Sequence, residues 1–212
     1  MCADPASACP PPLEPADDPA LRARLASSHV AIIGCGGLGS NAALMLVRSG
    51  VGHLTLIDFD VIEESNLNRQ MFFRDQLGEP KVEAIADTLR RVNPGVELAL
   101  VQECMTSENL IGYVGDAHVV IEAVDRADVK AMIANVLCAH APELPLVSAS
   151  GLAGIAPANE IVTERVGEHF YLVGDLHSDV RDGLPLLASR VMIAAAHQAH
   201  AAIRILLGHP EP

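Results

Sequence analysis

The sequence predicts an α/β fold of the Rossmann-like, doubly wound type with a mainly parallel sheet, and three observations lead to that prediction. Short apolar runs that suit buried strands alternate with longer patterns typical of helices. The first apolar run leads into a glycine-rich turn at residues 34–39, which opens a helical pattern. The chain has 212 residues, 50% of them hydrophobic, which is enough for one sizeable core.

Five parallel strands are expected, joined by helices that right-handed crossovers lay on both faces of the sheet. The strands lie near residues 29–34, 53–58, 96–102, 117–122 and 144–149. The helices lie near residues 38–49, 80–91 and 126–140, with a short one near 106–114 that Thr106 or Ser107 suits as a cap.

Beyond residue 150 the alternation weakens, and the stretches NEIVTER and HFYLVG indicate one or two extra strands outside the parallel core. A long Ala-rich C-terminal helix is expected from Leu184 to Leu207, with Pro185 in its first turn and Gly208 at its end. Apolar residues cover more than one face of this helix. It is either a fully covered core helix or one that also packs on a second subunit.

The first twenty residues are rich in proline among acids and alanines, and we expect them to form a disordered arm ahead of a single domain at residues 21–212. The arm lacks the basic start and the apolar run of a secretory signal, and no later segment has the pattern of a membrane span. We therefore expect a cytoplasmic location and no membrane partner.

The formal net charge of −13 argues against a nucleic-acid partner, because such binding depends on clustered Lys and Arg. The five cysteines are odd in number and form no CxxC pair, so we expect neither a disulfide framework nor a zinc site. Cys138 lies in a helical pattern and is expected as a small core residue. His197 and His200, three apart on the last helix, have a spacing that could bind a metal, although surface packing is favoured.

A nucleotide is expected on the glycine-rich turn. Gly34, Gly36 and Gly39 have the G-x-G-x-x-G spacing between a strand and a helix, where the backbone can approach phosphates at the amino end of the helix. Asp58 ends the second strand, where a carboxylate can accept hydrogen bonds from a ribose diol. NAD and ATP both carry such a ribose, so these residues alone leave both open.

The next polar cluster favours ATP over NAD. Asn66, Arg69 and Lys81 follow the ribose-binding position and place two cations and an amide near it. A planar guanidinium and a mobile ammonium suit a chain of phosphates from which pyrophosphate departs. An NAD-dependent oxidoreductase remains an alternative, but it gives no reason for the two cations.

The sequence resembles the ThiF/MoeB/HesA family, the bacterial relatives of ubiquitin-activating enzymes. The resemblance rests on GCGGLGSN, LIDFDVIEESNLNRQMFF, GEPKVEA, NPGVEL and AVDR, which occur in order across residues 29–154. The ending RVMIAAAHQAHAAIRILLG also looks like a short ThiF-like subgroup. The SNLNRQ element followed by PKVEA is far more specific than a glycine turn.

The resemblance implies ATP-dependent adenylation of the C-terminal glycine carboxylate of a small ubiquitin-like sulfur carrier. It favours a ThiS-like carrier ending in Gly-Gly, in thiamine thiazole formation, and a homodimer. It implies catalytic roles for Arg69, Lys81 and Asp125, with Asp125 holding Mg²⁺ directly or through water, or else capping the next helix. The implied ATP-binding residues are Gly34, Gly36, Gly37, Gly39, Asp58, Asn66, Arg69, Lys81 and Asp125.

Three features of the family remain open or absent. An arginine near the N-terminus reaches the triphosphate in the family, often from the other subunit, and Arg22 and Arg24 are the candidates here. The CxxC pairs that hold structural zinc in many relatives are missing, and no cysteine follows Cys138 for a covalent link to the carrier. The segment around residues 150–185 is expected to cover the active site or guide the carrier's tail.

Other interpretations of the same resemblance stay open. The protein could activate a different carboxylate or carrier, such as a MoaD-like carrier, a peptide terminus or a modified tRNA nucleoside. A binding scaffold that keeps the fold without catalysis is a further alternative, disfavoured because every expected type of active-site residue is present.

Overall fold

The computed structural model describes residues 18–212. The predicted disordered arm lies outside this range except for its last three residues. Of these, Pro19 opens helix α1 (Pro19–Ala26), and the Asp18 carboxylate caps it by accepting the backbone N–H groups of Ala20 and Leu21. This helix buries only Leu25, so its sequence lacks the apolar periodicity from which a helix is predicted.

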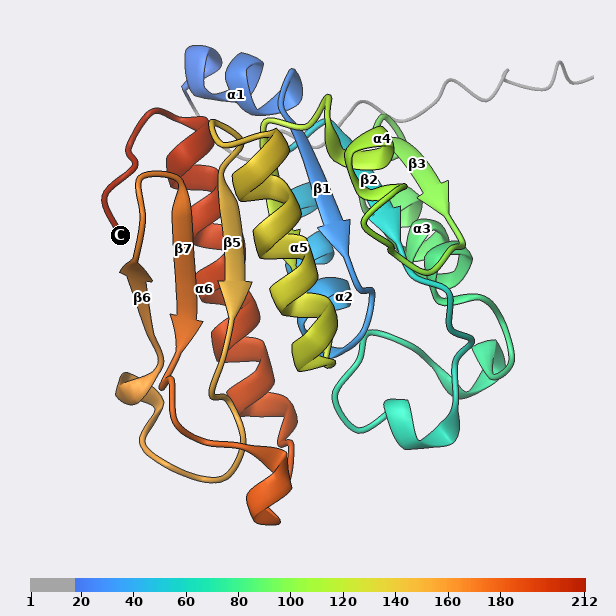
Figure 1. Cartoon of the computed structure of the whole chain (residues 1–212). Coiled ribbons are helices and arrows are strands. Elements are labelled where there is room, and N and C mark those ends of the chain that lie inside the picture. The colour runs from blue at the N-terminus through green and yellow to red at the C-terminus, as the bar shows by residue number, and fades with distance from the viewer. Residues whose placement is uncertain (1–17) are drawn as a thin grey trace, which may run out of the picture.

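A seven-stranded sheet forms the centre of the protein, in the order β3-β2-β1-β4-β5-β7-β6 (Figure 1). All neighbouring strands are parallel except β6, which runs antiparallel to β7 at one edge. The strands are β1 (His29–Ile33), β2 (His53–Ile57), β3 (Glu97–Val101), β4 (Val119–Glu122), β5 (Leu146–Ala149), β6 (Val162–Arg165) and β7 (Phe170–Gly174). The predicted Rossmann-like fold and its extra C-terminal strands are confirmed.

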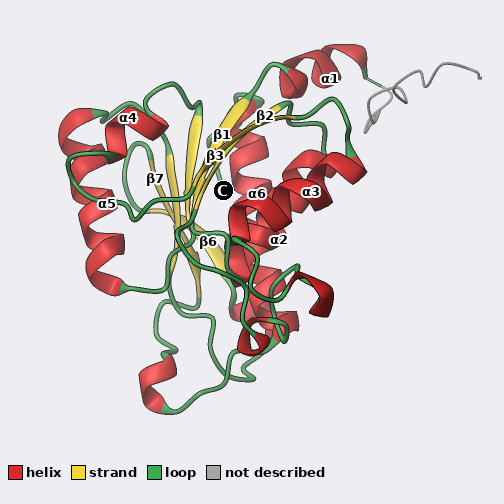
Figure 2. Ribbon diagram, turned by 90° about the vertical axis from the view of Figure 1, so that its right-hand side faces the viewer, coloured by secondary structure: helices red, strands yellow, loops and turns green. Residues whose placement is uncertain are grey.

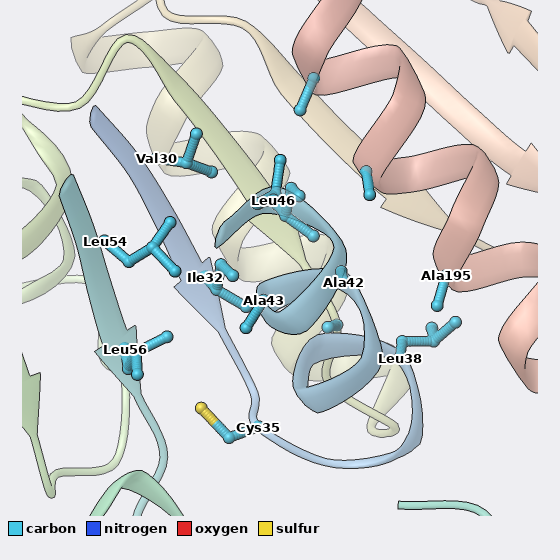
Figure 3. Close-up of a cluster of buried hydrophobic side chains, with 14 of the residues drawn as sticks. Val30, Ile32, Cys35, Leu38, Ala42, Ala43, Leu46, Leu54, Leu56 and Ala195 are labelled. Carbon is cyan, nitrogen blue, oxygen red and sulfur yellow. The ribbon is translucent and has the colours of Figure 1, made fainter. Parts of the chain in front are cut away.

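Helices cover both faces of the sheet, as Figure 2 shows. Helices α2 (Gly37–Arg48), α3 (Lys81–Val92) and α6 (Ala188–Leu206) lie on one face, and α4 (Leu110–Val114) and α5 (Ala127–His140) lie on the other. The two apolar layers of the core lie between the sheet and these helices. In the larger layer, Ile32 and Leu56 of the sheet lie opposite Leu38 and Ala42 of α2 (Figure 3). No helix in the described range combines the length and hydropathy needed to cross a bilayer.

The long C-terminal helix begins later than the sequence predicts. Residues 184–187 are not helical, because the carbonyl of Pro185 accepts the backbone N–H of Gly154 at 2.8 Å and ties this segment to the loop after β5. The helix starts at Ala188, so the expectation that Pro185 lies in its first turn is wrong. The expected end is confirmed, since Gly208 adopts a φ of 83° directly after the helix.

Candidate nucleotide site

The glycine-rich turn follows β1 at the carboxyl edge of the sheet and leaves no room for a side chain at Gly34 or at Gly39. A Cβ at Gly34, whose φ is 95°, would lie 2.7 Å from the carbonyl oxygen of Ala123, and a Cβ at Gly39 would lie 1.7 Å from the carbonyl oxygen of Gly34. The turn therefore packs directly against the end of β4 and against the first turn of α2. Gly36 forms the N-cap of α2 without a side-chain hydrogen bond, so the helix presents its free backbone N–H groups at this edge.

Asp58 reaches back from the end of β2 to this turn. Its Oδ2 accepts the backbone N–H of Cys35 at 2.6 Å, and its Oδ1 accepts that of Asp60 at 2.8 Å. Burial raises the pKa of this carboxyl above its usual range. Burial, together with the Asp58 charge, also raises the pKa of the Cys35 thiol well above its usual value, so Cys35 is a core residue rather than a nucleophile (Figure 3).

Lys81 begins α3 and is buried, with 6% of its surface exposed. Its Nζ lies 2.7 Å from Oδ2 of Asp60, and its backbone N–H donates to the carbonyl of the same residue. Because Asp60 is also bound to Asp58, the predicted phosphate-binding cation and the predicted ribose-binding carboxylate share a partner. No sequence pattern marks this partner, Asp60, as a site residue.

Asn66 and Arg69 lie in the loop between β2 and α3. Asn66 is buried, and its Oδ1 accepts the backbone N–H of Glu63, which fixes the loop. Arg69 is half-buried and donates through Nη1 to the carbonyl of Ser65 at 3.1 Å. A Cβ at Gly37 would lie 3.4 Å from Cγ of Arg69, so this side chain packs against the amino end of α2.

Gln70 is a further polar residue of the site, and its residue type and spacing alone do not predict this role. It is 8% exposed, and its Nε2 would lie 3.6 Å from a Cβ at Gly36. Its Oε1 is buried and has no hydrogen-bond partner among the described residues. Such an acceptor is costly to leave unsatisfied, and it is expected to meet a donor from a bound molecule or water.

Asp125 lies in the turn between β4 and α5. It is exposed, and it neither caps α5 nor accepts a hydrogen bond from any described residue. The carboxylate of Glu122, at the end of β4, fixes this turn. Glu122 is fully buried, and its Oε1 accepts hydrogen bonds from the backbone N–H of Val124 at 2.8 Å and from Nζ of Lys130 at 2.9 Å. Ser148 of β5 donates its hydroxyl to the same carboxylate.

These contacts bring most of the predicted residues together. The glycine turn touches the residues after β4, Asp58 and the loop that carries Arg69, all at the carboxyl edge of the sheet (Figure 1). The two N-terminal arginines lie elsewhere in this chain. Both are on α1, beyond the amino ends of the strands, and Arg24 donates through Nε to the carbonyl of Leu206 at 2.6 Å.

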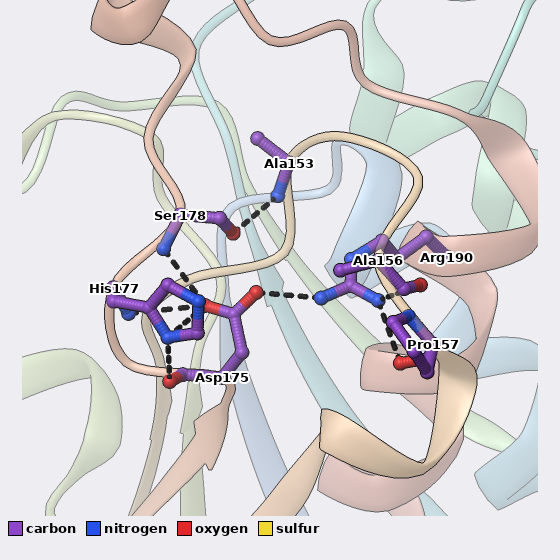
Figure 4. A network of polar contacts seen from close by, with 7 residues as sticks. All are labelled: Ala153, Ala156, Pro157, Asp175, His177, Ser178 and Arg190. Atoms are coloured by element: carbon purple, nitrogen blue, oxygen red, sulfur yellow. Dashed lines mark hydrogen bonds and ion pairs between the residues drawn. The ribbon is translucent and has the colours of Figure 1, made fainter.

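A buried ion pair organises the segment after β5. Arg190, at the start of α6, donates through Nη2 to Oδ2 of Asp175 at 2.5 Å and through Nη1 to the carbonyls of Ala156 and Pro157 (Figure 4). Burial opposes ionisation of Asp175, but hydrogen bonds from Ser178, His177 and Arg190 outweigh it and hold its pKa well below the usual range. The loop after β5, the turn after β7 and the start of α6 therefore form one anchored unit.

The remaining predicted residues lie outside the nucleotide site. Cys138 is exposed on α5, so the expectation of a core position is wrong. His197 is half-buried, and its Nδ1 lies 2.9 Å from the hydroxyl oxygen of Thr163. Burial lowers the pKa of His197, and the charge of His200 lowers it further. Both histidines line a hollow of about 260 Å³ beside β6, away from the glycine turn.

The fold and the site define a Rossmann-like nucleotide-binding protein, and the chain matches the ThiF family model over residues 13–212. It belongs to the ThiF family. It is 33% identical over 195 residues to the molybdopterin-synthase adenylyltransferase of Escherichia coli, covering 89% of this chain and 76% of that protein. It is 39% identical over 139 residues to the sulfur carrier protein ThiS adenylyltransferase of the same organism, covering 64% of this chain and 55% of that protein.

The tRNA threonylcarbamoyladenosine dehydratase of Escherichia coli is 35% identical over 142 residues, and the match spans 66% of this chain and 52% of that protein. The chain thus spans about half the length of two of these relatives. A crystal structure of the E. coli tRNA N6-threonylcarbamoyladenosine dehydratase in complex with ATP superposes with a TM-score of 0.82 and 24% identity, over 90% of both chains. That likeness confirms the fold.

Proposed function

We propose that the protein is an ATP-dependent adenylyltransferase that activates the C-terminal glycine carboxylate of a small ubiquitin-like sulfur carrier. The observation that carries the proposal is the meeting of four features at one edge of the sheet. These are a glycine turn without room for a side chain at Gly34 or Gly39, a buried carboxylate, two cations and an exposed carboxylate.

The site suits ATP in its shape and in its polar groups. The turn at Gly34 and Gly39 lets phosphates approach the amino end of α2, where free N–H groups and the helix dipole favour negative charge. Asp58 offers acceptors to a ribose diol at the end of β2. The unsatisfied Oε1 of Gln70 is an acceptor for a hydroxyl or amino group of the nucleotide.

The proposed reaction joins the carrier's carboxylate to the α-phosphate of ATP. A carboxylate oxygen attacks the α-phosphorus, the bond from that phosphorus to the oxygen bridging the β-phosphate breaks, and pyrophosphate departs. Arg69 and Lys81 mask the repulsion between the two anions and stabilise the charge that develops on pyrophosphate. Asp125 would hold Mg²⁺, which prefers few carboxylates together with phosphate oxygens and supplies further positive charge when bound.

A ThiS-like carrier ending in Gly-Gly, used in thiamine thiazole formation in the cytoplasm, is the proposed partner. A homodimer is part of the proposal, since neither N-terminal arginine lies at the site of its own chain. A MoaD-like carrier is a second candidate, because the molybdopterin-synthase adenylyltransferase matches over more of this chain than the ThiS adenylyltransferase does.

The test is ATP–pyrophosphate exchange by the purified full chain with Mg²⁺, with and without ThiS-like or MoaD-like carriers. We expect exchange that requires the carrier's terminal carboxylate and is lost in Asp125→Ala and Arg69→Ala. Asp128→Ala and Arg74→Ala are matched controls that change exposed residues on the same two segments and should retain exchange. ATP binding without exchange on any such carrier would contradict carrier adenylation and favour another carboxylate or a scaffold.

A further inference from the structure

We propose that Asp60 is a positioning residue that holds the Lys81 ammonium in place for the phosphates of ATP, and that a phosphate replaces Asp60 as the partner of this ammonium when ATP binds. The proposal deepens the proposed function, because it concerns the same nucleotide site. It adds Asp60 to the site, a residue that neither the glycine motif nor the positions of Arg69 and Lys81 predict.

The first argument is the burial of Lys81. Its side chain is 7% exposed, and an ammonium that has lost this much water needs a partner to stay charged. Oδ2 of Asp60, at 2.7 Å, is the one ion-pair or hydrogen-bond partner of Nζ among the described residues. In the free protein this carboxylate is therefore the anion that directly contacts the buried ammonium.

The second argument is the difference in exposure between the partners. The side chain of Asp60 is 47% exposed, so its carboxylate can return to water when a phosphate takes over Nζ. When a phosphate of ATP replaces the carboxylate of Asp60, the buried ammonium of Lys81 keeps an anionic partner throughout. Without the carboxylate, Nζ of Lys81 would lose the contact that holds it in its buried position, and ATP would meet no prepared cation.

The third argument is that the side chain acts apart from the backbone. The backbone N–H of Asp60 donates to Oδ1 of Asp58, and its carbonyl accepts the backbone N–H of Lys81 at 3.0 Å. An antiparallel bridge between Val61 and Pro80 holds the same two segments together. These contacts use the backbone of Asp60, so they should persist in Asp60→Asn. Asp58 then keeps its position, and only the ion pair between Asp60 and Lys81 is lost.

The experiment compares ATP with AMP, because only ATP has the β- and γ-phosphates. Dissociation constants of both nucleotides with Mg²⁺ are measured calorimetrically for the wild type, Asp60→Asn, Asp60→Glu, Lys81→Met and the double variant Asp60→Asn/Lys81→Met. We expect Asp60→Asn to weaken ATP binding at least about tenfold, equivalent to ~1.4 kcal/mol, with AMP binding unchanged. Asp60→Glu should restore most of the affinity, and Asp60→Asn should add no loss in the Lys81→Met background.

Three results would overturn the inference: equal losses for ATP and AMP, tighter ATP binding by Asp60→Asn, or additive effects of the two substitutions. Unchanged AMP binding also shows that the variant is folded. The outcome is separable from the proposed function. If wild-type protein binds ATP but adenylates no carrier, the function fails while the comparison of ATP with AMP still decides the role of Asp60.

Discussion

Replacement of Gly39 by alanine tests whether the glycine turn is as tightly packed as the structure indicates. Gly39 is the third residue of α2, and a Cβ there would lie 1.7 Å from the carbonyl oxygen of Gly34, 2.9 Å from its carbonyl carbon and 3.1 Å from Cγ2 of Ile32. Ordinary non-bonded separations are about 3.5 Å. The backbone of the turn or of the helix therefore has to move by more than 1 Å or so, because a carbonyl oxygen cannot rotate away as a side chain can.

Neither partner is free to move. The N–H of Gly34 donates to the carbonyl of Ile57 at 2.8 Å, and α2 buries Ala42, Ala43 and Leu46 completely against its neighbours. Overpacking of this kind costs about 1–3 kcal/mol, while alanine gains about 1 kcal/mol over glycine in a helix. Because the backbone of the turn and that of α2 are both held rigidly, we take the upper end of the overpacking cost. The expected net loss in unfolding free energy is about 2 kcal/mol, or a Tm lower by about 4–8 °C for a chain of this size.

The assay is equilibrium denaturation of the wild type, Gly39→Ala and Gly112→Ala, with ATP affinity measured in parallel. Gly112 is the matched control, because it lies in helix α4 and a Cβ there meets no atom within 4 Å. Gly112→Ala should raise stability by up to about 1 kcal/mol and leave ATP binding unchanged, whereas Gly39→Ala should lower both. Two substitutions with the same sign and size of effect would refute the packing argument.

Three other predictions concern ionisable side chains that are buried or half-buried. Asp175→Asn should lower the unfolding free energy at pH 7 by about 3–5 kcal/mol, since it leaves Arg190 buried without a charged partner; because the pKa of Asp175 is depressed on folding, its stabilising contribution is present above its unfolded pKa and is lost as the pH falls through its folded pKa. Glu122→Gln should cost about 2–3 kcal/mol, because Lys130 is 25% exposed and can partly regain water. Burial lowers the pKa of His29, so stability should fall as the pH drops below about 6.5, and His29→Gln should flatten that part of the profile.

Glu64→Gln is the control for the two acidic substitutions. It breaks the ion pair with Arg74, in which both side chains are more than 70% exposed, and should change stability by less than about 1 kcal/mol. Urea denaturation at several pH values measures all these variants. Equal costs for the exposed and the buried pairs, or a pH profile of His29→Gln that matches the wild type, would contradict the electrostatic explanation.

The sequence predicts the parallel core well, because the core strands are short and almost wholly apolar. The run HVAII of β1 pairs on both sides and is nearly fully buried, so only a central strand suits it. Helix boundaries were harder to predict where tertiary contacts decide them. The predicted helix at 106–114 starts only at Leu110, since Thr106 and Asn109 exchange hydrogen bonds in a turn instead.

Site residues that belong to a motif could be predicted from the sequence. Site residues whose role depends on their burial could not. The glycine turn, Asp58 and Arg69 follow from residue type and spacing, and the structure brings them together. Gln70 and Glu122 have ordinary polar identities, and their importance appears only once both are seen to be buried. The partner of Glu122 in β5, Ser148, is 26 residues away in sequence, and no local pattern reports that pairing.

The strand order has a consequence for how the newly made chain folds. Among the strands of this sheet, β1 leaves the ribosome first, yet it lies in the middle of the sheet between β2 and β4. At about 5–20 residues per second, its β4-facing edge waits several seconds for residues 119–122 to be synthesised. During that interval the row of N–H and C=O groups along HVAII is open to pairing with other chains. Slower translation between β2 and β4 should therefore increase aggregation of the newly made chain.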